Sequence, residues 1–186
     1  NFYFFSPPAP REKVRTIAVR DVTTRGAIAG SIAFFLTTDI HIEGFRVLEP
    51  SNRLPETFWW GTTGAILQSC TDVLIEDSEF REVDRLWDDL LRGDGCGLDL
   101  EGDNRNVVIR DCIFHNNDAV GLLTLTTFGP NSGVTVEDTT FFNNGLDAAT
   151  SFGGNAFEIK QANGSFVGQN AFSNLGLYRS EVSWDW

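Results

Sequence analysis

The feature that most constrains the fold is a short pattern that recurs along the chain. Each copy has two alternating apolar residues, then a polar pair, and then another apolar residue shortly after. The clearest copies begin at Asp72, Asn106, Gly133 and Gly164, an earlier one begins at Asp39, and a fainter one begins at Thr16. Counted at one matched position from Asp21 to Gln169, the steps are 23, 33, 34, 27 and 31 residues. Such a period indicates an array of stacked units.

A second short apolar segment precedes each of the five clearer copies: Ser31–Phe35, Gly64–Gln68, Gly97–Glu101, Gly121–Leu125 and Ala156–Lys160. The apolar residues of the repeat alternate with period two, which favours strands over helices. The spacing also exceeds the ~8–12 residues typical of sandwich strands. The repeat therefore predicts an all-β, right-handed parallel β-helix of about five to six coils. The alternative is a β-sandwich whose self-similarity is accidental.

Matched positions predict columns of side chains along the helix axis. One inward column holds Ile42, Ile75, Ile109, Val136 and Val167, and a second holds Val47, Phe80, Phe114, Phe141 and Phe172. Aromatic rings on successive coils would stack ~4.8 Å apart. Shortly after the second column come Asn116, Asn143 and Asn174, which we expect to form an asparagine ladder in a turn.

The chain is expected to form one domain over 1–186, with an entry or cap segment at 1–13, coils over 14–175 and an exit segment at 176–186. The aromatic stretch Asn1–Phe5 and the final Trp184 and Trp186 are typical of surfaces that other residues cover. An incomplete array needs caps at both ends. We therefore expect a longer array, or a further protein chain or subunit over the coil ends.

Composition excludes some partners. The formal net charge of −12 argues against nucleic acid, which needs clustered Lys and Arg. No apolar stretch approaches the ~18–20 residues of a membrane span. Cys70, Cys96 and Cys112 are too few for a disulfide framework and lack metal-ligand spacing. Cys112 shares an inward position with Ser78 and Thr139, so we expect a buried free thiol.

The segment from Asp94 to Asn117 resembles the pectate-lyase-like superfamily of right-handed β-helix proteins. The resemblance covers roughly residues 14–175 and concerns the fold. It implies an extracellular or cell-surface protein that acts on or binds a polysaccharide or oligosaccharide. A hydrolase or lyase is the leading expectation, and a non-catalytic adhesin, binder or assembly module is the alternative. Neither the basic cluster of pectate lyases nor the paired aspartates of polygalacturonases is present.

Strand alternation points to a candidate catalytic face. If Leu98 and Leu100 point inward, Asp99 and Glu101 face solvent ~6.7 Å apart. Two rungs further on, ~9.6 Å from Asp99, the same face carries Glu158 and Lys160. Paired carboxylates at such separations suit general acid and base catalysis, with Lys160 neutralising charge. Alternatively the carboxylates could hold Ca²⁺. The competing interpretation is that alternation places charged residues outside in any β-helix.

Candidate substrate-binding residues lie in the long connectors. These are Trp59, Trp60, Trp87 and Arg92. Exposed Trp rings suit the apolar faces of sugars, although Trp59 and Trp60 could instead anchor a loop. His115 follows the phenylalanine column and is a candidate proton-transfer group, with a surface role as the alternative. His41 occupies an outward strand position far from the acidic residues in sequence, and we expect a surface role for it.

Overall fold

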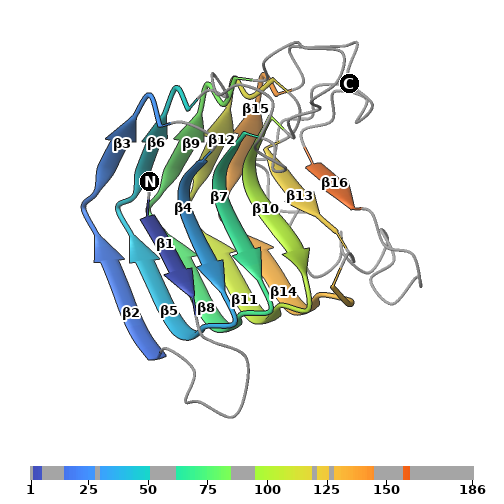
Figure 1. The fold of residues 1–186 in the computed structure, drawn as a ribbon. Coiled ribbons are helices and arrows are strands. Elements are labelled where there is room, and N and C mark those ends of the chain that lie inside the picture. The colour runs from blue at the N-terminus through green and yellow to red at the C-terminus, as the bar shows by residue number, and fades with distance from the viewer. Residues whose placement is uncertain are drawn as a thin grey trace, which may run out of the picture.

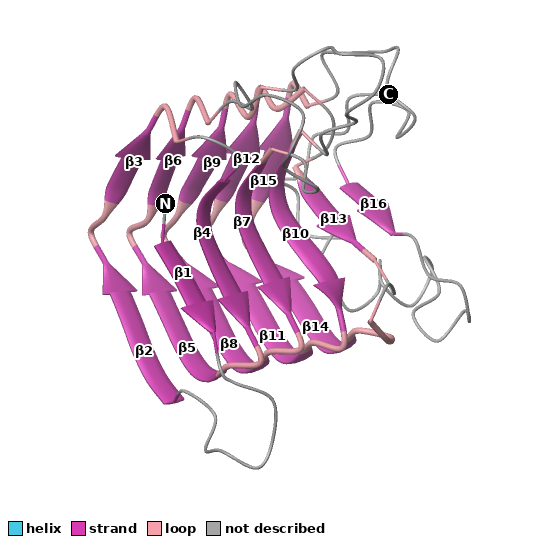
Figure 2. Ribbon diagram, viewed as in Figure 1, coloured by secondary structure: helices cyan, strands magenta, loops and turns pink. Residues whose placement is uncertain are grey.

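A computed structural model describes residues 2–5, 15–27, 30–50, 62–84, 95–118, 121–125, 128–144 and 157–159. These residues form strands and no helices, and the strands lie in three parallel sheets (Figures 1 and 2). The described part of the chain accordingly contains no helix that could span a membrane.

The chain visits the three sheets in a fixed order. Sheet A contains β1 (Phe2–Phe5), β4 (Gly30–Phe35), β7 (Thr63–Gln68), β10 (Cys96–Gly102), β13 (Leu122–Thr124) and β16 (Phe157–Ile159). Sheet B contains β2 (Arg15–Arg20), β5 (Thr38–Glu43), β8 (Thr71–Glu76), β11 (Arg105–Arg110) and β14 (Ser132–Glu137). Sheet C contains β3 (Thr23–Arg25), β6 (Arg46–Leu48), β9 (Glu79–Arg81), β12 (Ile113–His115) and β15 (Thr140–Phe142).

One strand from each sheet makes a coil, and each coil pairs in register with the next (Figure 1). The described strands make five such coils, and β16 begins a sixth. This confirms the predicted parallel β-helix. The segment Phe2–Phe5, expected to lie in an entry segment, pairs with β4 as the first strand of sheet A.

The predicted aliphatic column is confirmed within the described residues. Ile42, Ile75, Ile109 and Val136 pair in register along sheet B, and each is at most 1% exposed. Val167 lies outside the described residues. Alternation explains the column, because every second residue of these strands points into the coil.

The phenylalanine column lines the interior along sheet C. Phe114 stacks between Phe80 and Phe141, with ring centroids 4.9 Å apart on each side and interplanar angles of 5° and 7°. Val47 continues the column, and Phe172 lies outside the described residues. Gly97 is required where this stack meets sheet A. A Cβ there would lie 2.9 Å from Cδ1 of Phe114 and 2.6 Å from the carbonyl oxygen of Gly121.

Each sheet ends at a corner built from two residues. The first has positive φ at the described corners other than Pro130–Asn131, and the second points into the interior. Between sheets B and C the first position is held by Asp21, Gly44, Asp77, Asp111 and Asp138, with φ from 47° to 61°. Aspartate, asparagine and glycine tolerate this left-handed conformation better than other residues do. The recurring acidic residue in the repeat is therefore a backbone requirement of the turn.

Asparagine ladders occupy the second position of the other two corners. Nδ2 of Asn117 donates to Oδ1 of Asn144 over 2.7 Å, and Asn104 contacts Asn131 in the same way over 2.9 Å. The prediction of a ladder at Asn116 and Asn143 was therefore displaced by one residue. Those two residues have φ of 55° and 49° and form the left-handed position instead. Asn174 lies outside the described residues.

Cys112 occupies the second position of the corner between sheets B and C. Its sulfur is buried and contacts the carbonyl oxygen of Arg110 at 3.1 Å, and burial raises its pKa to about 12. Ser78 and Thr139 hold matching positions and accept hydrogen bonds from backbone N–H groups of the preceding coil. The prediction of a buried free thiol is confirmed. Such a thiol is not a nucleophile near neutral pH.

Candidate functional site

Asp99 lies on the outward side of sheet A but is not exposed. Leu98 and Leu100 point into the core, as predicted. Asp99 pairs in register with Ile66 on one side and Leu123 on the other, and its exposed fraction is 0%. The prediction that Asp99 faces solvent is therefore wrong. Sequence alternation correctly indicates the side of the sheet, but it does not indicate whether that side is covered.

The other residues grouped with Asp99 are only partly placed. Glu101 sits at a bulge, because Leu100 pairs with Leu67 whereas Gly102 pairs with Gln68. Glu158 pairs with Leu123, two rungs from Asp99 as expected, and the structure describes only its backbone. The remaining candidates, Lys160, Trp59, Trp60, Trp87 and Arg92, lie outside the described residues. Their predicted roles, like those of Asp99 and Glu101, stay predictions.

His115 lies on the outer face of sheet C, away from the sheet that carries Asp99. Its Nε2 is 3.0 Å from Oε1 of Glu79, and its ring stacks on Phe142 at 4.6 Å. The Nδ2 amide of Asn116 donates to Nδ1 of the imidazole over 3.0 Å. In the neutral imidazole, this amide orientation corresponds to the tautomer that carries its proton on Nε2 and donates to Glu79. Both ring nitrogens are engaged, so this arrangement leaves no lone pair for proton abstraction.

Glu79 is surrounded by positive and hydrogen-bonding groups. Arg46 donates to its Oε2 over 2.8 Å, and Nε of Arg81 is 3.5 Å from its Oε1. Burial by itself would raise the pKa of Glu79. Hydrogen bonds from His115 and Arg46 outweigh that effect, so the pKa lies below its ordinary value. Glu79 is therefore ionised near neutral pH and a poor general acid.

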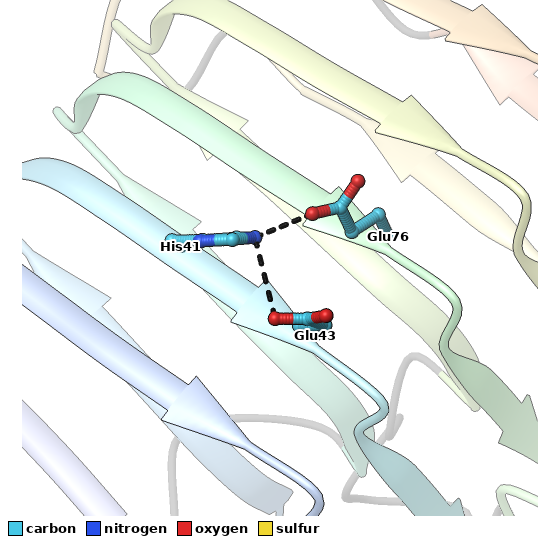
Figure 3. A group of neighbouring side chains, drawn as sticks. All are labelled: His41, Glu43 and Glu76. Atoms are coloured by element: carbon cyan, nitrogen blue, oxygen red, sulfur yellow. Dashed lines mark hydrogen bonds and ion pairs between the residues drawn. The ribbon is translucent and has the colours of Figure 1, made fainter.

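A second histidine cluster lies on the outer face of sheet B. His41 on β5 points toward two carboxylates, Glu43 on the same strand and Glu76 on β8 (Figure 3). Nε2 of His41 is 2.6 Å from Oε1 of Glu76 and 4.0 Å from Oε2 of Glu43. One donor atom from each residue lies within 4.8 Å of the others, which is a spacing suited to a metal ion.

Arginines flank this cluster in the same outward column. The order along the rungs is Arg20, Glu43, Glu76, Arg110 and Glu137. Nε of Arg110 donates to Oε2 of Glu76 over 2.8 Å. That hydrogen bond and the one from His41 hold the pKa of Glu76 below its ordinary value despite partial burial. Glu76 therefore presents an ionised oxygen, Oε1, toward His41.

Sequence reasoning missed this cluster. The alignment of Ile42 with Ile75 already implied that Glu43 and Glu76 are cross-strand neighbours, because each lies one residue further along its strand. His41, one residue before Ile42, points outward on the same face. His41 is far in sequence from the acidic residues considered above. The pairing of β5 with β8 nevertheless places Glu76, from the next coil, beside it.

Comparison with family models identifies the architecture. A model described as "Right handed beta helix region" matches residues 38–172, which is more than half of the chain. The chain belongs to the right-handed β-helix family. Comparison with curated proteins and with solved structures found no significant match. Any finer statement about the function of this β-helix protein therefore rests on its own residues.

Proposed function

We propose that this β-helix protein modifies or degrades an extracellular polysaccharide, and that Asp99 takes part in the reaction as an acid or a base. The observation that carries the proposal is the complete burial of Asp99 on an outward strand position. Carboxylates are almost never fully buried unless they are paired, so a buried Asp marks a position where the surrounding residues hold an acid. Among the described residues, Asp99 is the one Asp, Glu, Lys or Arg in the buried class.

The fold does not require an acid at this position. Ala33, Ile66 and Leu123 occupy the same outward column on neighbouring rungs and are also buried. An apolar residue would continue the column without the desolvation cost of a buried carboxylate. Acids that are buried within a protein are candidates for proton transfer. Because Asp99 is covered in the free protein, the proposal requires that substrate binding uncovers it.

A non-catalytic carbohydrate-binding or assembly role is the second candidate. It is favoured by the outer faces of sheets B and C, where charged residues pair between coils. Arg46 bridges to Glu79 of the next rung, and Arg20 bridges to Glu43 at 3.2 Å. The low pKa values of Glu76 and Glu79 make this surface unsuited to general acid catalysis.

A panel of neutral and uronate polysaccharides tests the proposal. The full chain is incubated with each, and two products are measured: new reducing ends, and the ultraviolet absorbance of an unsaturated sugar. Hydrolysis gives reducing ends alone, and elimination gives both. Release of reducing ends from at least one polysaccharide is the expected result. Saturable binding without turnover would support the second candidate, and neither binding nor turnover across the panel would reject both.

A further inference from the structure

We propose that His41, Glu43 and Glu76 form a binding site for a divalent transition-metal ion, with Zn²⁺ as the representative ion. The cluster is on sheet B, so the proposal is independent of any role for Asp99. It supplies one imidazole nitrogen and two carboxylates, and the three donor atoms lie within 4.8 Å of one another. Figure 3 shows the three side chains converging from two neighbouring strands.

The distances suit a tetrahedral ion. Zn–N and Zn–O bonds of ~2.0–2.2 Å place neighbouring donor atoms ~3.3 Å apart. The separations from Nε2 of His41, 2.6 Å to Glu76 and 4.0 Å to Glu43, lie on either side of that value. Side-chain rotations that move the donor atoms by no more than about one ångström would therefore make the two separations equal. No movement of the strands is needed.

The charge pattern of the outward column also points to a cation. Along Arg20, Glu43, Glu76, Arg110 and Glu137 the sign alternates except between Glu43 and Glu76. Like charges directly opposite each other on adjacent strands are unfavourable. His41 lies beside this one break in alternation, and a bound dication would neutralise it.

Arg110 prepares one ligand for the ion. It hydrogen-bonds Oε2 of Glu76, which leaves Oε1 directed at His41. Outer groups that hold a ligand in this way raise metal affinity. The side chain of Glu76 is only 13% exposed, whereas those of His41 and Glu43 are 30% and 42% exposed. The ion would therefore be held from the protein side and would keep open positions toward solvent.

The donor set favours a transition metal over Ca²⁺ or Mg²⁺. Calcium and magnesium take oxygen ligands, whereas imidazole nitrogen suits zinc, nickel, copper and iron. The other histidine cluster supports this assignment by contrast. There one carboxylate, Glu79, lies beside His115, so the described residues around His115 do not bring three donor atoms together.

Isothermal titration of the metal-free full chain with Zn²⁺ tests the proposal. One strongly bound Zn²⁺ per chain is expected, with little competition from excess Ca²⁺. His41→Ala should weaken binding by about tenfold or more, because it removes the nitrogen ligand. Thermal unfolding gives a second measurement. Zn²⁺ should raise the melting temperature of the wild type by more than that of His41→Ala at the same Zn²⁺ concentration, because an ion stabilises the state that binds it.

His115→Ala is the matched control, because His41 and His115 are the two histidines of the chain. It should bind Zn²⁺ like the wild type. Glu43→Gln provides a ligand variant that leaves the buried core untouched, and it should also weaken binding while melting near the wild-type temperature without metal. Equal affinity in the wild type and His41→Ala, loss of binding in His115→Ala instead, or no binding by the wild type would each overturn the proposal.

Discussion

Phe114→Ala is expected to lower the free energy of unfolding by about 3–5 kcal/mol. The ring is fully buried and lies between Phe80 and Phe141 at 4.9 Å on each side, so its removal leaves a cavity bounded by two rigid rings. Stacked coils depend on their neighbours, and the loss weakens the contacts between three successive coils. Urea unfolding followed by circular dichroism measures the change.

Phe128→Ala is the control for this prediction. Phe128 is 53% exposed, and its truncation should change the unfolding free energy by less than about 0.5 kcal/mol. The loss of unfolding free energy for Phe114→Leu should lie between those of the two alanine variants, because leucine retains much of the buried volume. If Phe114→Ala and Phe128→Ala lower the free energy of unfolding by equally small amounts, the stacked interior column is not the core of this protein.

Asn104→Ala should lower the free energy of unfolding by about 2–4 kcal/mol, because it leaves several buried polar groups without a hydrogen bond. Oδ1 of Asn104 accepts from the backbone N–H of Cys70 over 2.9 Å. Its Nδ2 donates to the carbonyl oxygen of Leu67 over 3.0 Å and to Oδ1 of Asn131. Asn104 is fully buried, so these groups lie away from bulk solvent. The same urea titration measures the loss.

Asn106→Gly is the matched control for the ladder. Asn106 is exposed, has φ of 54°, and occupies a position where the next coil already uses Gly133. Glycine accepts this conformation, so the variant should unfold within about 0.5 kcal/mol of the wild type. A cost for Asn104→Ala no greater than that of the control would mean that the ladder adds little to stability.

The inward columns could be predicted from the sequence because strand alternation determines them. The position of the asparagine ladder could not. Asparagine occurs twice in succession at 116–117 and again at 143–144, so both registers satisfied the repeat. The left-handed φ of Asn116 decides between them, since it turns the following residue, Asn117, into the interior.

Burial of Asp99 also escaped prediction, although a signal was present. Sheet A strands contain continuous apolar runs such as Ile32–Phe35 and Ala65–Leu67. Such runs are typical of strands covered on both faces, whereas the sheet B strands alternate with polar residues. Applied to Gly97–Glu101, that difference would have predicted a buried Asp99. The cluster of His41 with Glu76 required only the register that the isoleucine column already supplied.

The central functional claim is that Asp99 takes part in the reaction. Its most direct test is the turnover rate of Asp99→Asn on any polysaccharide that the panel shows the wild type to cleave. Asparagine keeps the size and removes the titrating proton, so turnover should fall about a hundredfold or more. Asp111→Asn, an exposed corner residue that asparagine suits, should retain the wild-type rate. A folded Asp99→Asn protein with the wild-type rate would contradict the claim.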